Sequence, residues 1–197
     1  YLTCAAMEPP DCAEHYTEAL VRLPGIGTDY ALPALPVAAD RSRYGLPADG
    51  PLFLCPQSLF KIHPDDDDLH ARVLAAVPDA SLVLFHGRHP RITDRFAARM
   101  EAACRRVGVD MYSRVRWLPQ CSHDDYLGIN SVCTAMLDTT RWSGGNTTLD
   151  ALAVGLPVVT RPGRLMRARQ SAAMLHLLGI DDLVCDDDDD YIRVAAG

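Results

Sequence analysis

SGGNTTLDALAVGLPVVTRPG, residues 143–163, contains a loop, a helix pattern, a strand pattern and a turn in one short run. Small polar residues up to Asn146 precede a helical pattern at Thr147–Val154, and the apolar run Pro157–Thr160 follows it directly. A short helix leading into a continuous apolar strand is typical of α/β proteins, in which helices cover a buried parallel sheet. This stretch therefore predicts the fold class.

The same alternation extends over most of the chain. Strand-like apolar runs occur at Leu52–Cys55, Ser81–His86, Val115–Leu118, Thr134–Asp138, Pro157–Thr160 and Leu183–Cys185. Helical patterns lie between or after them, at Asp66–Val77, Ile92–Val107, His123–Ser131, Thr147–Val154, Leu165–Leu178 and after the aspartate run 186–190. Strands that alternate with helices indicate βαβ units with right-handed crossovers. We expect a doubly wound parallel sheet of the Rossmann-like kind.

The first 45 residues have a different character. They are rich in Pro and Gly, with one short helix expected at Asp11–Val21 and an extended run at Leu32–Val37. Such a stretch has too few apolar positions for a core of its own. We therefore divide the chain into an irregular or helical connector, residues 1–45, and a sheet domain, residues 46–197.

Composition excludes several classes of protein. Hydrophobic residues make up 48% of the chain and charged residues 23%, as in ordinary globular proteins. The net charge of −7 argues against a nucleic-acid partner, and no apolar run is long enough to span a membrane. Seven scattered Cys without a CxxC pair indicate reduced thiols and a cytoplasmic protein. The chain begins at Tyr1 without a Met and ends in a helical pattern, so we expect a fragment of a longer protein.

Metal-binding patterns are weak. His86 and His89 have a ligand-like spacing, but no third ligand follows in a suitable rhythm. The aspartate runs 65–68 and 186–190 lack the alternating ligands and the Gly of a calcium loop, and they suit helix starts instead. We expect no metal cofactor.

In sheets of this kind, ligands bind beyond the carboxyl ends of the strands. Four loops lie there: Pro56–Pro64, Phe85–Arg91, Pro119–His123 and Thr139–Thr148.

The last of these loops leads into a helix start that suits a phosphate group. We expect Asn146 to be the N-cap, with Thr147 and Thr148 on the first turn, where backbone N–H groups are unpaired and the helix dipole is positive. Gly145 allows close approach of the backbone, and Asp150 could accept hydrogen bonds from sugar hydroxyls. The alternative is a well-capped helix that only packs on the sheet.

Lys61 is the only lysine of the chain, and it follows the first predicted strand of the sheet domain. An ammonium at this edge would stabilise a diphosphate whose negative charge grows as it leaves. The alternative is an ordinary surface lysine.

Four stretches together resemble one enzyme family: LPADGPLFLCPQSLFKIHPDD (46–66), WLPQCSHDDYL (117–127), LDTTRWSGGNTTLDALAVGLPVVTRPG (137–163) and RARQSAAMLHLLGI (167–180). They resemble the catalytic region of O-linked N-acetylglucosamine transferases of the SPINDLY-like type, family 41, which is associated with TPR repeats. MEPPDCAEHYTEALVRLPGIG (7–27) resembles the segment that joins the two catalytic lobes of that family.

The resemblance implies the C-terminal, nucleotide-sugar-binding lobe of a GT-B glycosyltransferase. That family moves N-acetylglucosamine from UDP-GlcNAc to Ser or Thr hydroxyls of proteins with inversion and without a metal. Its protein acceptors are held by TPR repeats and the N-terminal lobe, which also supplies the proposed general base. The fragment by itself is therefore expected to be inactive.

Roles for single residues also follow from the resemblance. Lys61 matches the lysine on the diphosphate, Thr147 and Thr148 match the pair on the phosphates, and Asp150 matches the carboxylate on the ribose. His123 and Tyr126 lie in the segment that matches the loop around the nucleoside.

Three alternatives remain open at this stage. Plant relatives of this type use GDP-fucose, and here Gly128, Ile129 and Asn130 stand where an Arg near the base is common. A degenerate lobe would instead serve as a docking module, without nucleotide binding and with a large exposed apolar face. A nucleotide-sugar epimerase of related architecture would place extra carboxylates and His at the cleft.

Overall fold

A five-stranded parallel sheet forms the centre of the protein. The structure, a computed structural model, describes residues 1–35 and 39–197. The strands are β3 (Leu52–Cys55), β4 (Ser81–Phe85), β5 (Val115–Leu118), β6 (Ala135–Leu137) and β7 (Val158–Val159). They lie in the order β5-β4-β3-β6-β7, and every pair is parallel. The predicted parallel sheet is confirmed.

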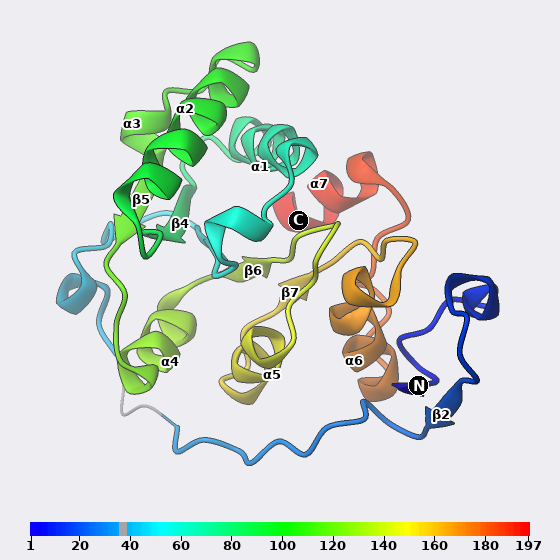
Figure 1. Cartoon of the computed structure of the whole chain (residues 1–197). Helices are drawn as coiled ribbons and strands as arrows, with labels where there is room; N and C mark the ends of the chain where they lie inside the picture. The colour runs from blue at the N-terminus through cyan, green and yellow to red at the C-terminus, as the bar shows by residue number, and fades with distance from the viewer. Residues whose placement is uncertain (36–38) are drawn as a thin grey trace.

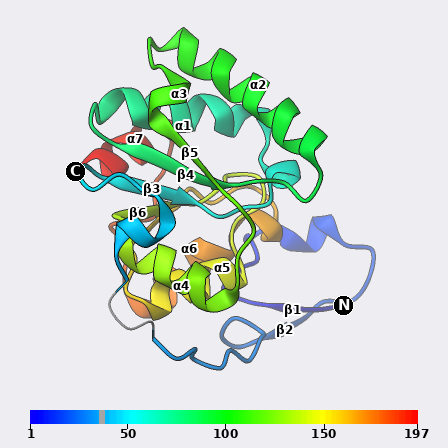
Figure 2. The same cartoon turned by 90° about the vertical axis from the view of Figure 1, so that its left-hand side faces the viewer.

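Helices cover both faces of the sheet (Figures 1 and 2). One face carries α1 (Pro64–Ala76), α2 (Pro90–Arg106), α3 (Met111–Arg114) and α7 (Asp188–Ala196). The other carries α4 (His123–Val132), α5 (Asn146–Ala153) and α6 (Gln170–Leu178). The doubly wound, Rossmann-like arrangement expected from the sequence is therefore correct. None of the helices in the described ranges is long and apolar enough to cross a membrane.

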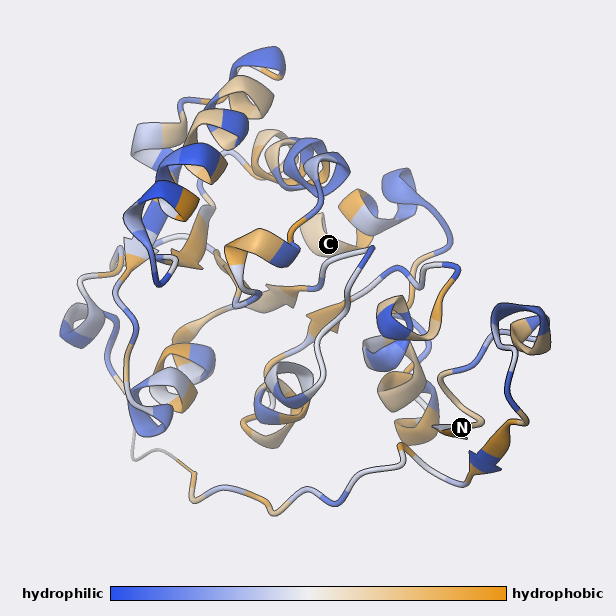
Figure 3. Cartoon of the chain, in the orientation of Figure 1, coloured by the Kyte–Doolittle hydropathy of each residue, from blue (hydrophilic) through white to orange (hydrophobic). Residues whose placement is uncertain are grey.

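Two apolar layers hold the helices to the sheet. Side chains alternate across a strand, so β3 sends Phe53 into the layer under α1 and α2 and Leu54 into the layer above α4 and α5. All four residues of β3 are buried, as expected for a central strand covered on both faces. Figure 3 shows the same distribution, with apolar colour along the strands and polar colour mainly on the helices.

Histidine and proline start two of the helices. His63 accepts a hydrogen bond from the Asp65 N–H at 3.3 Å before Pro64, and His89 accepts one from Arg91 N–H at 3.2 Å before Pro90. Proline suits the first helical position because the N–H there has no partner within the helix. The helices consequently begin two residues earlier than predicted, and His89 is a helix cap.

The N-terminal segment differs from the prediction. The helix expected at Asp11–Val21 is wrong: only a 3-10 turn, η1 (Cys12–His15), forms. Val21 instead starts β2 (Val21–Leu23), which pairs in parallel with β1 (Leu2–Cys4). The backbone is already extended at Tyr16, whose hydroxyl donates to Glu8 at 2.9 Å, and residues 21–23 cannot be helical because they pair with β1.

This segment packs beside α6, where Cys4 and Met7 contact Ala173 and Met174. A second 3-10 turn, η2 (Arg41–Tyr44), precedes the main sheet. The end of the expected extended run, residues 36–38, lies outside the described residues, and the boundary at 45/46 stays a prediction.

Two further predictions need correction near the C-terminus. The helix expected at Leu165–Leu178 is a 3-10 turn, η4 (Met166–Ala168), followed by α6. The sixth strand expected at Leu183–Cys185 is an isolated bridge between Val184 and Thr160. Thr160 directly follows β7, and its N–H and carbonyl make both hydrogen bonds of this bridge, with Leu183 and Cys185.

Asp138 organises the loop after β6. Its carboxylate is buried and accepts hydrogen bonds from the Gly144 N–H at 2.8 Å and the Thr160 hydroxyl at 2.7 Å. Its backbone carbonyl accepts one from Tyr191 of α7 at 2.9 Å. One residue thus connects the loop before α5, the end of β7 and the helix layer on the opposite face. Burial raises the pKa of Asp138 to about 6, against the opposing effect of these hydrogen bonds.

Gly50 provides a test of the junction between β3 and β4. Its φ is +81°, and an added Cβ would lie 2.4 Å from the Asp79 carbonyl oxygen. Gly108 has a similar φ of +74° but open space around it. We expect Gly50→Ala to lower the free energy of unfolding by about 1–3 kcal/mol more than Gly108→Ala, measured by urea denaturation. Equal losses would show that the backbone φ alone matters there.

The raised pKa of Asp138 predicts a pH dependence. A carboxyl that holds its proton more tightly in the folded state stabilises the fold fully below pH 4, and that contribution is lost as the pH rises to about 6. We expect the free energy of unfolding of the wild type, minus that of Asp138→Asn, to fall by about 3 kcal/mol over this range and then to level off. The subtraction removes the effect of other acids. A difference independent of pH would contradict the prediction.

Candidate functional site

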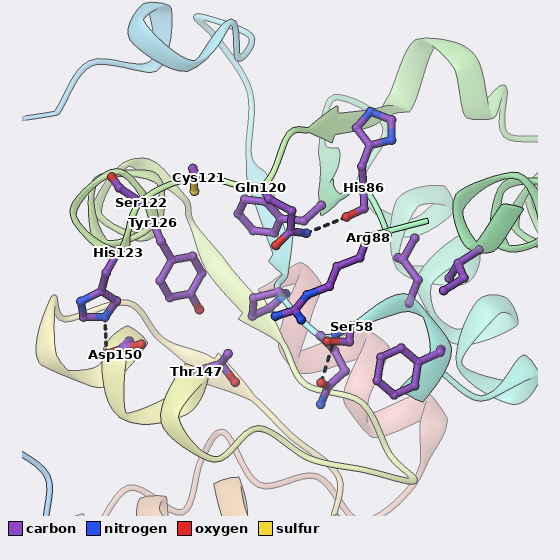
Figure 4. Close-up of a pocket in the computed structure, with 17 residues that line it drawn as sticks. Ser58, His86, Arg88, Gln120, Cys121, Ser122, His123, Tyr126, Thr147 and Asp150 are labelled. Carbon is purple, nitrogen blue, oxygen red and sulfur yellow. Dashed lines mark hydrogen bonds and ion pairs between the residues drawn. The ribbon is translucent and has the colours of Figure 1, made fainter. Parts of the chain in front are cut away.

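A cavity of about 520 Å³ opens at the carboxyl ends of the strands (Figure 4). Its walls come from residues 56–60 after β3, 85–88 after β4 and 120–123 after β5, together with Ile92, Tyr126, Thr147 and Asp150. The chain builds the sheet outward from β3 through β4 to β5 and then returns to the other side of β3 with β6. The loops after β3 and β6 therefore diverge at this reversal, which is where α/β sheets bind ligands. Three of the four predicted loops line the cavity, and α5 supplies the end of the fourth.

The start of α5 places only one of its two threonines in the cavity. Thr147 lines it, whereas Thr148 is fully buried and its hydroxyl lies 2.7 Å from that of Ser171. The N-cap is Gly145 rather than Asn146, because the Gly145 carbonyl accepts the first helical hydrogen bonds. Asn146 is exposed and, with Gly145, borders a different hollow against the N-terminal segment.

Gly144 allows this tight turn. A Cβ at Gly144 would lie 2.3 Å from the Thr148 hydroxyl and 2.7 Å from that of Thr147. The loop backbone and the first turn of α5 are thus in direct contact, so any larger residue would displace the hydroxyl that faces the cavity.

Asp150 is held by two neighbours. Its Oδ1 accepts a hydrogen bond from the Tyr30 hydroxyl at 2.6 Å and lies 3.1 Å from Nε2 of His123. Asp150 is 7% exposed and lines the cavity, three residues after Thr147 on the same helix face. Burial and the bond to Asp150 raise the pKa of Tyr30, which therefore stays a donor. The arrangement leaves a fixed carboxylate at one end of the cavity.

Aromatic rings form the wall next to this carboxylate. The Tyr126 ring lies 5.9 Å from that of Phe85 and 6.3 Å from that of His123, centre to centre. The Tyr126 hydroxyl is buried and has no hydrogen-bond partner among the residues that the structure describes. Figure 4 shows it directed into the cavity. A buried hydroxyl without a partner is costly, so this one is ready to bind a polar group of a ligand.

Lys61 lies at the rim. It ends the 3-10 turn η3 (Leu59–Lys61), and its ammonium sits 4.6 Å from the centre of the Trp142 ring. Trp142 belongs to the loop between β6 and α5, and its carbonyl accepts a hydrogen bond from Gln57 at 2.8 Å. The lysine is therefore next to the predicted loop, but it is not one of the residues that line the cavity.

The sequence did not single out three residues of this region: Tyr30, Arg88 and Trp142. Arg88 and Trp142 lie inside loops that were predicted as wholes, so only their position after a strand could have pointed to them. Tyr30 had no such signal, because it comes from the N-terminal segment, 120 residues before Asp150.

The two threonines give a matched pair of variants. Thr148→Val removes the hydroxyl paired with Ser171 inside the core, so we expect a loss of about 1 kcal/mol in the free energy of unfolding. Thr147→Val changes a hydroxyl at the cavity wall and should cost less than about 0.5 kcal/mol. Thermal and urea denaturation of both variants would check this, and a larger loss for Thr147→Val would contradict the orientation described.

Comparison with sequence families identifies relatives of this fold. The family model described as glycosyl transferase family 41 matches residues 24–197. A Solanum lycopersicum protein named as a probable UDP-N-acetylglucosamine–peptide N-acetylglucosaminyltransferase SPINDLY is 28% identical over 98% of this chain and 20% of its own length. A Caenorhabditis elegans protein named as the corresponding transferase is 26% identical over 85% of this chain and 14% of its own. This chain thus spans a fifth or less of these relatives.

Comparison with solved structures leads to the same family. A variant of the Thermobaculum terrenum O-GlcNAc transferase superimposes on all of this chain with a TM-score of 0.82 and 31% identity, and the match covers 36% of that protein. Sucrose-phosphate synthase from Thermosynechococcus elongatus matches with a TM-score of 0.68 at 19% identity, which shows the fold alone. The fold is a GT-B Rossmann-like lobe, and the chain belongs to glycosyl transferase family 41.

Proposed function

We propose that this protein is the donor-binding lobe of a glycosyltransferase that moves N-acetylglucosamine from UDP-GlcNAc to Ser or Thr hydroxyls of proteins, with inversion. The observation that carries the proposal is the pairing of Thr147 and Asp150 in one cavity at the reversal of strand order. The names of the relatives, a UDP-N-acetylglucosamine transferase from Caenorhabditis elegans and a probable one from Solanum lycopersicum, support the choice of donor over GDP-fucose.

The two ends of the cavity suit the two ends of a nucleoside diphosphate. Asp150 offers a buried acceptor to the ribose hydroxyls, and Tyr30 and His123 keep it in place. The first turn of α5 offers free N–H groups, the positive end of the helix dipole and the Thr147 hydroxyl to the phosphates. The Tyr126 hydroxyl and the aromatic wall would contact the nucleoside.

Lys61 would act on the departing diphosphate. Its side chain is partly exposed and rests on Trp142, close to the loop that leads into α5. A lysine in this position can move its ammonium toward the phosphates without a change in the backbone. As the bond to the sugar breaks, negative charge grows on the leaving oxygen, and a nearby ammonium lowers the energy of that state.

The rest of the reaction needs groups outside this chain. The other lobe of a longer protein would supply the general base, and that lobe and the TPR repeats would hold the protein acceptor. The chain matches only a small share of each relative's length, which agrees with this division. We propose a cytoplasmic location, in keeping with the seven cysteines, which are all free. We also expect no nucleic-acid partner and no need for a divalent metal, because side chains and the helix dipole meet the charge of the phosphates.

Isothermal titration with UDP, UDP-GlcNAc and GDP tests the proposal. We expect saturable binding of both uridine nucleotides, unchanged by EDTA, and much weaker binding of GDP. Thr147→Val should weaken UDP binding about ten-fold with little change in stability, and Lys61→Ala should also weaken it. The matched control is Arg72→Ala, which removes an exposed cation on α1 that pairs with Asp189, away from the cavity. No binding of any of the three nucleotides would refute the proposed function.

A further inference from the structure

Arg88 reaches into the cavity from the loop between β4 and α2. Figure 4 shows its side chain extending away from the β4 loop toward Ser58 on the opposite wall, above Thr147. The loop is fixed on both sides of this residue. The Gly87 N–H donates to the Thr93 hydroxyl at 2.9 Å, and the His86 carbonyl accepts from Gln120 at 2.6 Å. The backbone before Arg88 is therefore held at the cavity wall by two hydrogen bonds.

Arg88 is the cavity cation that remains available for a ligand. Three basic residues line the cavity: His86, Arg88 and His123. The His86 ring stacks on Trp117 at 5.6 Å and points away, and His123 is bound to Asp150. Within residues 1–35 and 39–197, Arg88 forms no ion pair and no side-chain hydrogen bond. Eight other arginines form ion pairs: Arg43, Arg72, Arg99, Arg105, Arg106, Arg141, Arg161 and Arg193.

We propose that Arg88 binds the diphosphate of the nucleotide-sugar donor and with Thr147 forms the anion-binding end of the cavity. This inference rests on the proposed function and adds a residue that neither the motifs nor the family resemblance contained. A guanidinium carries several N–H donors in a planar fork, which fits two phosphate oxygens at once. Such a contact neutralises part of the phosphate charge and also fixes the orientation of the diphosphate.

The distribution of charge in the cavity supports this role. Asp150, the only carboxylate among its lining residues, lies at the far end beside His123 and does not pair with Arg88. A cation and a carboxylate kept apart in one cavity match a ligand with phosphates at one end and sugar hydroxyls at the other. Lys61, on Trp142 outside the lining, would then approach the same phosphates from the rim.

The test compares ligands with and without phosphates. We expect Arg88→Ala to weaken the binding of UDP about ten-fold or more and to leave that of uridine unchanged, measured by isothermal titration and by ligand-observed NMR. Arg88→Lys should recover part of the loss, because it keeps the charge without the fork. The UDP affinity of the wild type should also fall more steeply with added salt than that of Arg88→Ala.

Arg91→Ala is the matched control. Arg91 is also exposed and lies three residues further on, but it does not line the cavity, so its removal should leave UDP binding as in the wild type. If the wild type binds UDP and Arg88→Ala binds it equally well, the role of Arg88 is wrong while the proposed function stands. An equal loss of UDP and uridine affinity would also overturn it. Failure of the wild type to bind UDP would instead refute the proposed function.

Discussion

The buried carboxylate of Asp138 is the interaction on which the site depends. It follows β6, the first strand after the order of the sheet reverses, and it accepts hydrogen bonds from the Gly144 N–H and the Thr160 hydroxyl. Asp66, which accepts from Thr140, and the Arg167 carbonyl, which accepts from the Ser143 N–H, hold other points of the same loop. Because the loop is fixed, the first turn of α5 has its final position before any ligand arrives. Dipoles oriented in advance stabilise charge without the cost of reorganisation.

Much of the fold could be predicted because it rests on the period of apolar residues. β3 and β5 were predicted with correct bounds. β3 is a continuous apolar run, which fits a central strand covered on both faces, whereas β5 is an edge strand that includes Arg116. The failures occurred where tertiary contacts override local pattern. Val21–Leu23 pairs with β1 instead of continuing a helix, and Val184 forms a single bridge with Thr160. Helix starts were missed where His63 replaced the usual N-cap residues.

The site was predictable at the level of loops and less so at the level of side chains. Asn146, Thr147 and Thr148 are consecutive, and successive residues on an α-helix point about 100° apart, so the three cannot all face one cavity. The rotation of α5 is set by Ala151, buried toward the sheet, and by the contact of Thr148 with Ser171. That rotation leaves Thr147 and Asp150, three residues apart, on the cavity side. The sequence shows that residues three apart on the helix share a face, but it does not show which of these residues face the cavity.

The rim of the cavity carries a different chemistry from its interior. Phe60, at the edge of the cavity wall next to Lys61 in sequence, is 72% exposed, and Trp142, against the Lys61 ammonium, is 42% exposed. Large aromatic side chains exposed beside a polar cavity are typical of surfaces that meet another molecule or another part of the same one. The interior, with Asp150 at one end and Arg88 at the other, offers contacts that suit a nucleotide, whereas the rim offers rings that suit a sugar face or an acceptor chain. Lys61, with its ammonium 4.6 Å from the centre of the Trp142 ring, lies at the boundary between these two regions.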